Sequence, residues 1–186
     1  MRLPYVPTPP IPANAEEAAI IERTLERRGD EGLIPLDLAL LHSPAITNGW
    51  NSFMGAIRTK TSISADLREL AICRVAALNR AHFEWIQHYP LALEAGISMK
   101  GLKTIRDGTP GDLNEKQIAV LDFTTASTKD GHVADMIFEG LKKHFSDKEI
   151  VEIVATVAAY NCVSRFLVAL DVAEGNGVSV ADYPMK

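Results

Sequence analysis

The chain has 186 residues, of which 47% are hydrophobic, and its formal net charge at neutral pH is −5. This length allows one domain with a hydrophobic core and is short for two. The negative charge, together with the absence of any Lys or Arg run longer than a pair, excludes the usual electrostatic footprint for nucleic acid or an anionic membrane surface.

The distribution of apolar residues and cysteines predicts a cytoplasmic protein. No run of about 20 uninterrupted apolar residues suggests a membrane span, and the N-terminus lacks the apolar segment of a signal peptide. The two cysteines, Cys73 and Cys162, are far apart and each lies in a helical pattern. This spacing provides neither a disulfide framework nor a paired metal motif, so we expect both thiols to be reduced and partly buried.

The N-terminal half predicts an extended arm followed by helices. Five prolines in the first twelve residues indicate an arm over residues 1–14, ahead of a single domain over residues 15–186. Asn14 and Glu17 resemble a capping box at the start of a helix that ends at Gly29. The following segment predicts two helices separated at Ser43–Pro44, because proline is tolerated in a first helical turn.

The remaining chain also has helical periodicity. Ser64 is a predicted cap, and the "LNRA" stretch at residues 78–81 breaks the helix that follows it. A second helix then runs to Gly96 and tolerates Pro90 with a kink. Further helices are expected in residues 113–128, 132–145 and 146–175. Without a convincing strand, the pattern predicts an all-α fold of about seven to nine helices.

The segment "ELAICRVAALNRAHFEWIQHYPLALEAGIS", residues 69–98, contains a thiol, two imidazoles and several carboxylates. Cys73 has no second cysteine at the spacing of a Cys-x-x-Cys redox motif. We therefore expect Cys73 to be a buried core residue. His82, Glu84 and His88 could supply three metal ligands. However, His82 lies about 160° from Glu84 around a helix, on its opposite side, so we expect no metal site.

An acid–base pair is the remaining chemistry in this segment. Glu84 and His88 are one helical turn apart, so the carboxylate can orient the imidazole and raise its pKa toward the range of a proton donor. The same spacing is common in surface ion pairs. The residues alone leave both interpretations open.

Residues 63–98, with "LLHSPAITNGWNSFMGAIR" upstream and "LNEKQIAVLDFTTAST" and "LKKHFSDKEIVEIVATVAAYNCVSRFLVAL" downstream, resemble the carboxymuconolactone decarboxylase family, whose superfamily includes alkylhydroperoxidase D. The resemblance covers about residues 36–170 and includes a Tyr-Asn…Arg-Phe signature in the last helix. It implies an all-α, alkylhydroperoxidase D-like helical bundle. It further implies that no cofactor is used and that the chain assembles with itself as a trimer or hexamer.

The family pattern is only partly present. The peroxidase branch has a glutamate, then a Cys-x-x-Cys motif, then a histidine, and the matching positions here are Glu69, Ala81, Glu84 and His88. Both thiols of the motif are therefore replaced. The resemblance therefore places the chain nearer the decarboxylases. Without the two thiols of the motif, we expect no dithiol peroxidase activity. It also implies a helical hairpin that brings Glu69 and His88 together.

The resemblance predicts a cofactor-independent lyase for a small carboxylated lactone or β-keto-type acid, acting through an enolate. We expect His88 to deliver the proton, and Glu84 or Glu69 to orient it. Arg74 or Arg80 is expected to bind the substrate carboxylate, although for Arg74 an ion pair with nearby Asp66 or Glu69 is the favoured interpretation.

Other side chains are candidates for the wall of the pocket. His82 is either a second polar wall or a surface residue, and the helix N-terminus should keep it neutral. Trp50 and Trp85, with Phe53 and Phe83, line the apolar part of the pocket or belong to the core.

Three alternatives remain open at the sequence level. The first is a non-redox family member that binds a small molecule or partner without catalysis. The second is an isomerase or ring-opening enzyme of secondary metabolism. A redox function requires Cys73 to be exposed and to have a low pKa. Independently of these alternatives, we expect the Pro-rich arm to extend across a subunit boundary.

Overall fold

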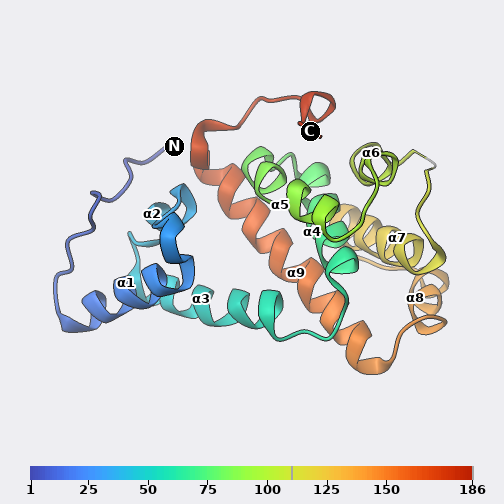
Figure 1. Cartoon of the computed structure of the whole chain (residues 1–186), viewed down its shortest axis with the longest axis horizontal. Helices are drawn as coiled ribbons and strands as arrows, with labels where there is room; N and C mark the ends of the chain where they lie inside the picture. Colours follow the sequence, from blue (N-terminus) through green and yellow to red (C-terminus); the bar gives the residue numbers. More distant parts are fainter. Residues whose placement is uncertain (110, 186) are drawn as a thin grey trace. The chain divides into compact units, whose positions relative to one another are not determined.

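The structure is a computed structural model that describes residues 1–109 and 111–185. Over these residues the chain is helical and has no strand, which confirms the all-α prediction (Figure 1). The α-helices are α1 (Ala15–Arg28), α2 (Pro35–Leu40), α3 (Pro44–Thr59), α4 (Ala65–Asn79), α5 (His82–Glu94), α6 (Met99–Asp107), α7 (Glu115–Asp130), α8 (Asp135–Lys142) and α9 (Asp147–Leu170).

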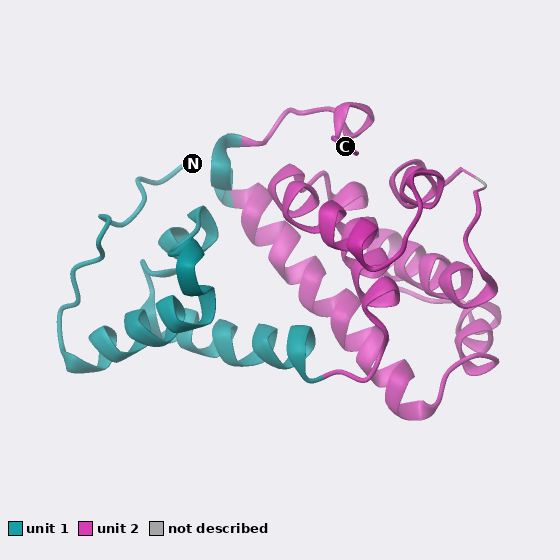
Figure 2. Ribbon diagram, in the orientation of Figure 1, with its two compact units in different colours: residues 1–60, 170–174 teal, residues 61–169, 175–186 magenta. Residues whose placement is uncertain are grey.

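The contacts of the chain divide it into two compact units (Figure 2). Unit 1 consists of residues 1–60 and 170–174, and unit 2 of residues 61–169 and 175–186. The expected division into an arm and one domain therefore stays a prediction.

Unit 1 contains the Pro-rich arm and the first three helices. The Asn14 side chain accepts a hydrogen bond of 2.9 Å from the Glu17 N–H, which confirms the predicted start of α1. The arm contacts its own unit: the Arg2 N–H donates to Leu170 O at 2.7 Å, and the Ala173 N–H donates to the Tyr5 hydroxyl at 2.8 Å. Within this chain the arm contacts residues 170–174, and its expected reach across a subunit boundary stays a prediction.

A helical hairpin of α4 and α5 forms the centre of unit 2. Arg80 has a φ of 58°, in the left-handed region, and this turn ends α4 just before α5 begins at His82. The predicted break at residues 78–81 is confirmed. Because α4 is buried on nearly every side, polar residues on it are forced to find partners inside the protein.

Helix α9 connects to two other helices of unit 2 through the polar side chain of Asn161. Asn161 is buried, accepts a hydrogen bond from Asn79 on α4 at 2.9 Å, and donates to Thr128 on α7 at 3.0 Å. The predicted cap is present, with Glu149 accepting from the Ser146 N–H at 2.8 Å. The helix ends at Leu170, five residues before its predicted end, where Asp171 has a φ of 52°.

Helix α9 has the length and composition of a membrane span, by these two criteria alone, and such a segment was not expected from the sequence. Its charged residues lie mostly near its N-terminal end, which leaves a long apolar stretch. Of the apolar window in α9, 44% is buried inside the protein. A core helix of a helical protein has the same composition.

One helix was missed by the sequence analysis. α6 begins after Ser98, whose side chain accepts from the Gly101 N–H at 2.9 Å, and ends at Gly108, whose φ is 74°. Both are standard signals for a helix start and stop. The helix has only nine residues and lies between two longer helical patterns, so it was not predicted.

Candidate active site

Glu69 on α4 and His88 on α5 form a buried pair. The His88 Nδ1 atom lies 2.7 Å from Glu69 Oε2, and the two residues are only 7% and 4% exposed, respectively. The hairpin brings them together across 19 positions of sequence. The geometry therefore selects Glu69, of the two expected carboxylates, as the partner of the histidine.

Glu84 has a different partner, although it lies one helical turn from His88. Its two carboxylate oxygens accept hydrogen bonds of 3.0 and 2.9 Å from the Ser164 hydroxyl on α9. Burial raises the pKa of Glu84 well above its usual value, and the Ser164 hydrogen bond opposes this increase. Glu84 therefore pairs with Ser164 instead of with His88 as expected. Its raised pKa favours the protonated carboxyl group.

The raised pKa of Glu84 predicts a pH-dependent cost in stability. From about pH 4.5 up to the folded pKa, the unfolded chain ionises while folded Glu84 stays neutral, so the folded state loses stability as pH rises. Each pH unit in this window costs about 1.4 kcal/mol. We expect Glu84→Gln to be increasingly more stable than wild type between pH 5 and 7, measured by urea unfolding. An identical difference at both pH values contradicts this assignment.

Cys73 lies on α4 one turn after Glu69 and is completely buried. Burial raises its thiol pKa well above the usual value, and the negative charges of Glu69 and Glu84 raise it further. Cys162 on α9 is exposed. The expectation that both thiols are partly buried is therefore wrong, and Cys73 meets neither requirement of the redox alternative.

We expect Cys73→Ala to retain turnover of the native substrate and to give no thiol-dependent peroxide reduction above background. The substitution removes a sulfur from a packed core, so it costs about 1 kcal/mol of stability. Steady-state kinetics and thermal unfolding measure the two effects. Loss of turnover in a folded variant would restore the redox interpretation.

Arg74 was expected either to bind substrate or to pair with Asp66 or Glu69. Its guanidinium takes other protein partners, and its role in substrate binding stays a prediction. Its guanidinium is directed at the C-terminal end of α6, where Nη1 donates to Ile105 O at 2.9 Å and Nε donates to Thr125 on α7 at 3.0 Å. The Asp66 carboxylate accepts instead from the side chain of Gln117. Helix carbonyl oxygens without intrahelical partners attract such a cation.

This position predicts a structural role for Arg74. Arg74→Met should lower the free energy of unfolding by about 2 kcal/mol, because buried carbonyl oxygens lose their donor. Turnover by the folded fraction should stay close to wild type. Urea unfolding and steady-state kinetics test this together, and an unchanged stability with a strongly raised KM would return Arg74 to the substrate site.

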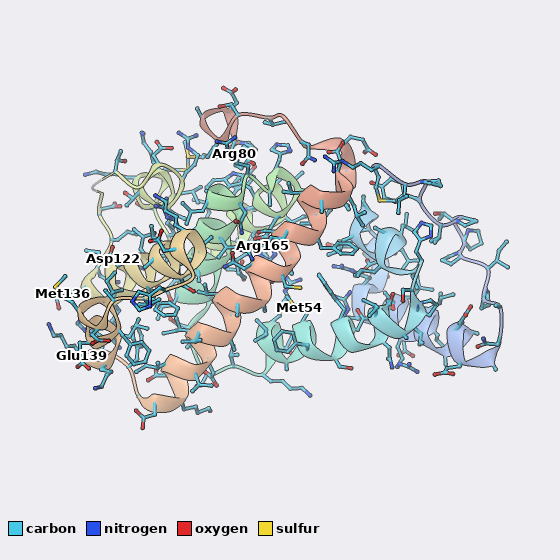
Figure 3. The ribbon with its side chains drawn as sticks, turned by 180° about the vertical axis from the view of Figure 1, so that it is seen from behind. Met54, Arg80, Asp122, Met136, Glu139 and Arg165 are labelled. Atoms are coloured by element: carbon cyan, nitrogen blue, oxygen red, sulfur yellow. The ribbon has the colours of Figure 1, made fainter. Side chains whose placement is uncertain are left out.

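Arg80 and His82 lie at the turn into α5. Arg80 is exposed (Figure 3), whereas His82 is half-buried and its ring centroid is 5.1 Å from that of Tyr183. Burial, rather than the helix N-terminus expected from the sequence, lowers the pKa of His82. Arg80 is thus the arginine of the predicted pair that remains available to a substrate carboxylate.

The predicted aromatic residues have different surroundings. Trp85 is completely buried and its indole N–H donates to Pro184 O at 2.7 Å, so it holds the C-terminal segment, and its role in substrate binding stays a prediction. Phe83 is buried, and Phe53 on α3 is exposed. Trp50 is also on α3, in unit 1, and its role in substrate binding stays a prediction.

Three residues near the pair were not assigned a role from the sequence. The Tyr160 ring on α9 meets the His88 ring edge-on, with centroids 5.2 Å apart at 87°. Ser164 lies one turn later on the same face of α9 and contacts Glu84. That i, i+4 spacing was a usable signal, whereas Tyr183 follows a loop without periodicity.

Within residues 1–109 and 111–185, no group of three His, Cys, Asp or Glu side chains is arranged to hold a metal ion.

Comparisons with known proteins match this fold. A solved AhpD core, an uncharacterized peroxidase-related protein from Ralstonia eutropha, has a TM-score of 0.78 at 21% identity and covers 92% of this chain and 90% of that chain. A peroxidase-related protein from Silicibacter has a TM-score of 0.73 at 17% identity, covering 91% of each chain. The debrominase Bmp8, in complex with 2,3,4-tribromopyrrole, has a TM-score of 0.69 at 19% identity, covering 87% and 88%.

At these identities the likeness shows the fold alone. A search of curated proteins gives no match. The model of the carboxymuconolactone decarboxylase family matches residues 44–107, the segment that contains Glu69, Glu84 and His88. Residues 44–107 are thus similar to the carboxymuconolactone decarboxylase family, and the chain has the fold of the AhpD-like structures.

Proposed function

We propose that this protein is a cofactor-independent lyase that decarboxylates a small carboxylated lactone or β-keto-type acid. The observation that carries the proposal is the buried 2.7 Å contact between His88 Nδ1 and Glu69 Oε2. Such a contact fixes the ring orientation and the position of one proton, as a general acid requires.

The first step of the proposed reaction breaks the bond between carbon and the departing carboxylate. The electron pair moves into the adjacent carbonyl to form an enolate, and carbon dioxide leaves. A poorly solvated site favours the loss of a carboxylate charge, and a positive group or hydrogen-bond donor stabilises the enolate oxygen. Arg80 supplies the positive charge for binding the substrate carboxylate in this proposal.

The second step transfers a proton to carbon. With Nδ1–H directed at Glu69, the Nε2–H of the imidazolium is the proton that His88 gives to the enolate. Glu69 stabilises the charged ring before the transfer, and solvent returns the proton afterwards. Atoms and charge balance without a redox partner.

The cysteines support this choice over a thiol peroxidase. The catalytic thiol of such an enzyme works as an accessible thiolate. Cys73 is buried beside two carboxyl groups that oppose its ionisation, and the Cys-x-x-Cys positions hold Ala81 and Glu84.

The test is incubation with a panel of carboxylated lactones and β-keto acids while release of carbon dioxide is followed. We expect release from at least one of them at a rate well above the uncatalysed reaction. Consumption of substrate without carbon dioxide favours the isomerase or ring-opening alternative, because these reactions share the enolate. No consumption of any compound contradicts the lyase proposal.

We also propose that the chain associates with copies of itself. Val151 on α9 is 66% exposed and Val154 is 37% exposed, although α9 is otherwise a core helix. Exposed apolar side chains on one helix are typical of protein–protein contacts.

A further inference from the structure

The C-terminal segment, residues 175–185, belongs to unit 2 and contacts the first turn of α5 at His82 and Trp85. Besides the Trp85 hydrogen bond to Pro184, Arg106 Nη1 on α6 donates to Ala181 O at 3.1 Å and to Tyr183 O at 3.3 Å. At its other end, a Cβ on Gly175 would lie 3.1 Å from His82 Cβ and Nδ1, a tight contact that glycine avoids. The segment is therefore fixed at both ends.

These contacts bury the Tyr183 side chain. Tyr183 is 2% exposed, and its ring packs between His82 and Trp85, with centroids 5.1 and 5.8 Å away. Its hydroxyl has no hydrogen-bond partner among the described residues. A buried hydroxyl without a partner is costly, so native structures seldom retain one without a functional reason.

The surroundings of this hydroxyl define the ligand that it suits. Burial raises the pKa of Tyr183 to about 12, which keeps the hydroxyl protonated and able to donate. The charges of Arg80 and Glu84 both act on it, in opposite directions. Glu84, whose charge acts on this hydroxyl, lies one helical turn from the candidate acid His88 on α5.

We propose that the Tyr183 hydroxyl donates a hydrogen bond to a substrate oxygen, the carbonyl oxygen that becomes the enolate. The C-terminal segment is then part of the active site, with Tyr183 as its oxygen-binding residue. This inference deepens the proposed function and rests on it for the substrate class. The binding step itself can be tested without turnover.

The test uses Tyr183→Phe, which removes the oxygen and keeps the ring. The probe is 5-oxotetrahydrofuran-2-carboxylate, a stable lactone carboxylate, titrated into the full-length protein by calorimetry. We expect Tyr183→Phe to weaken probe binding about tenfold, the effect of losing one hydrogen bond to a polar ligand. The melting temperature of the free variant should equal or exceed that of wild type, because no hydrogen bond within the protein is lost.

Tyr89→Phe is the matched control, because Tyr89 also stacks on Trp85, with centroids 6.3 Å apart. It should bind the probe as wild type does. Equal probe binding by Tyr183→Phe and wild type, or no binding by wild type, overturns the inference. If Tyr183→Phe loses probe binding while no acid in the panel releases carbon dioxide, the oxygen-binding site stands and the lyase proposal fails.

Discussion

His88→Gln is expected to lower kcat by about 10²–10⁴-fold, the usual range for loss of a general acid. Glutamine can still donate a hydrogen bond to Glu69, so the buried carboxylate keeps a partner and the fold is retained. KM should change less than kcat, because Arg80 and the walls of the site still bind the substrate. Steady-state kinetics, with a thermal melt to verify folding, provide the measurement.

His82→Gln is the matched control for this prediction. His82 lies at the start of the same helix, and its ring contacts Tyr183 instead of the Glu69 carboxylate. We expect it to affect KM or stability more than kcat. If His88→Gln keeps full turnover and His82→Gln loses it, the wrong face of α5 has been assigned to the chemistry.

Glu69→Gln is expected to have the second largest effect and to lower kcat by roughly 10²-fold. The amide oxygen can still accept from Nδ1–H and hold the ring, but it cannot stabilise the imidazolium by charge. The optimum of the pH–rate profile should therefore move toward lower pH, since the enzyme needs the protonated ring. Steady-state kinetics across a pH series detect both changes.

Glu84→Gln separates the two buried carboxyl groups. Glu84 accepts from Ser164, whereas His88 Nδ1 lies 2.7 Å from Glu69, so substitution of Glu84 should leave the pH–rate profile nearly unchanged. The variant is isosteric with Glu69→Gln and lies on the facing helix. A larger kinetic effect at Glu84 than at Glu69 would assign the working carboxylate to Glu84.

Local sequence signals predicted the helices well. Asn14, Ser146 and the Pro44 break act over one helical turn, so their effect does not depend on the rest of the fold. The hairpin at residues 78–81 was predicted from the family resemblance and is formed through Arg80 in the left-handed region. Only the weakly marked α6 was missed.

The pairing of side chains was harder to predict, because it depends on which helix faces which. The i, i+4 rule favoured Glu84 as the partner of His88, but α9 brings Ser164 to Glu84 and the hairpin brings Glu69 to His88. Arg74 likewise contacts carbonyl oxygens of α6, a helix that the sequence analysis did not include. Tyr183 depends on the path of an irregular segment, for which periodicity gives no information.

The most direct test of the Glu69–His88 acid is the stereochemistry of the product formed in D₂O, measured by NMR. The wild-type enzyme should place one deuteron, in a single configuration, on the carbon that lost the carboxylate, because His88 delivers it from one side. The residual product of His88→Gln should contain both configurations, since solvent then protonates the enolate. A single configuration at an undiminished rate in His88→Gln would contradict proton delivery by His88.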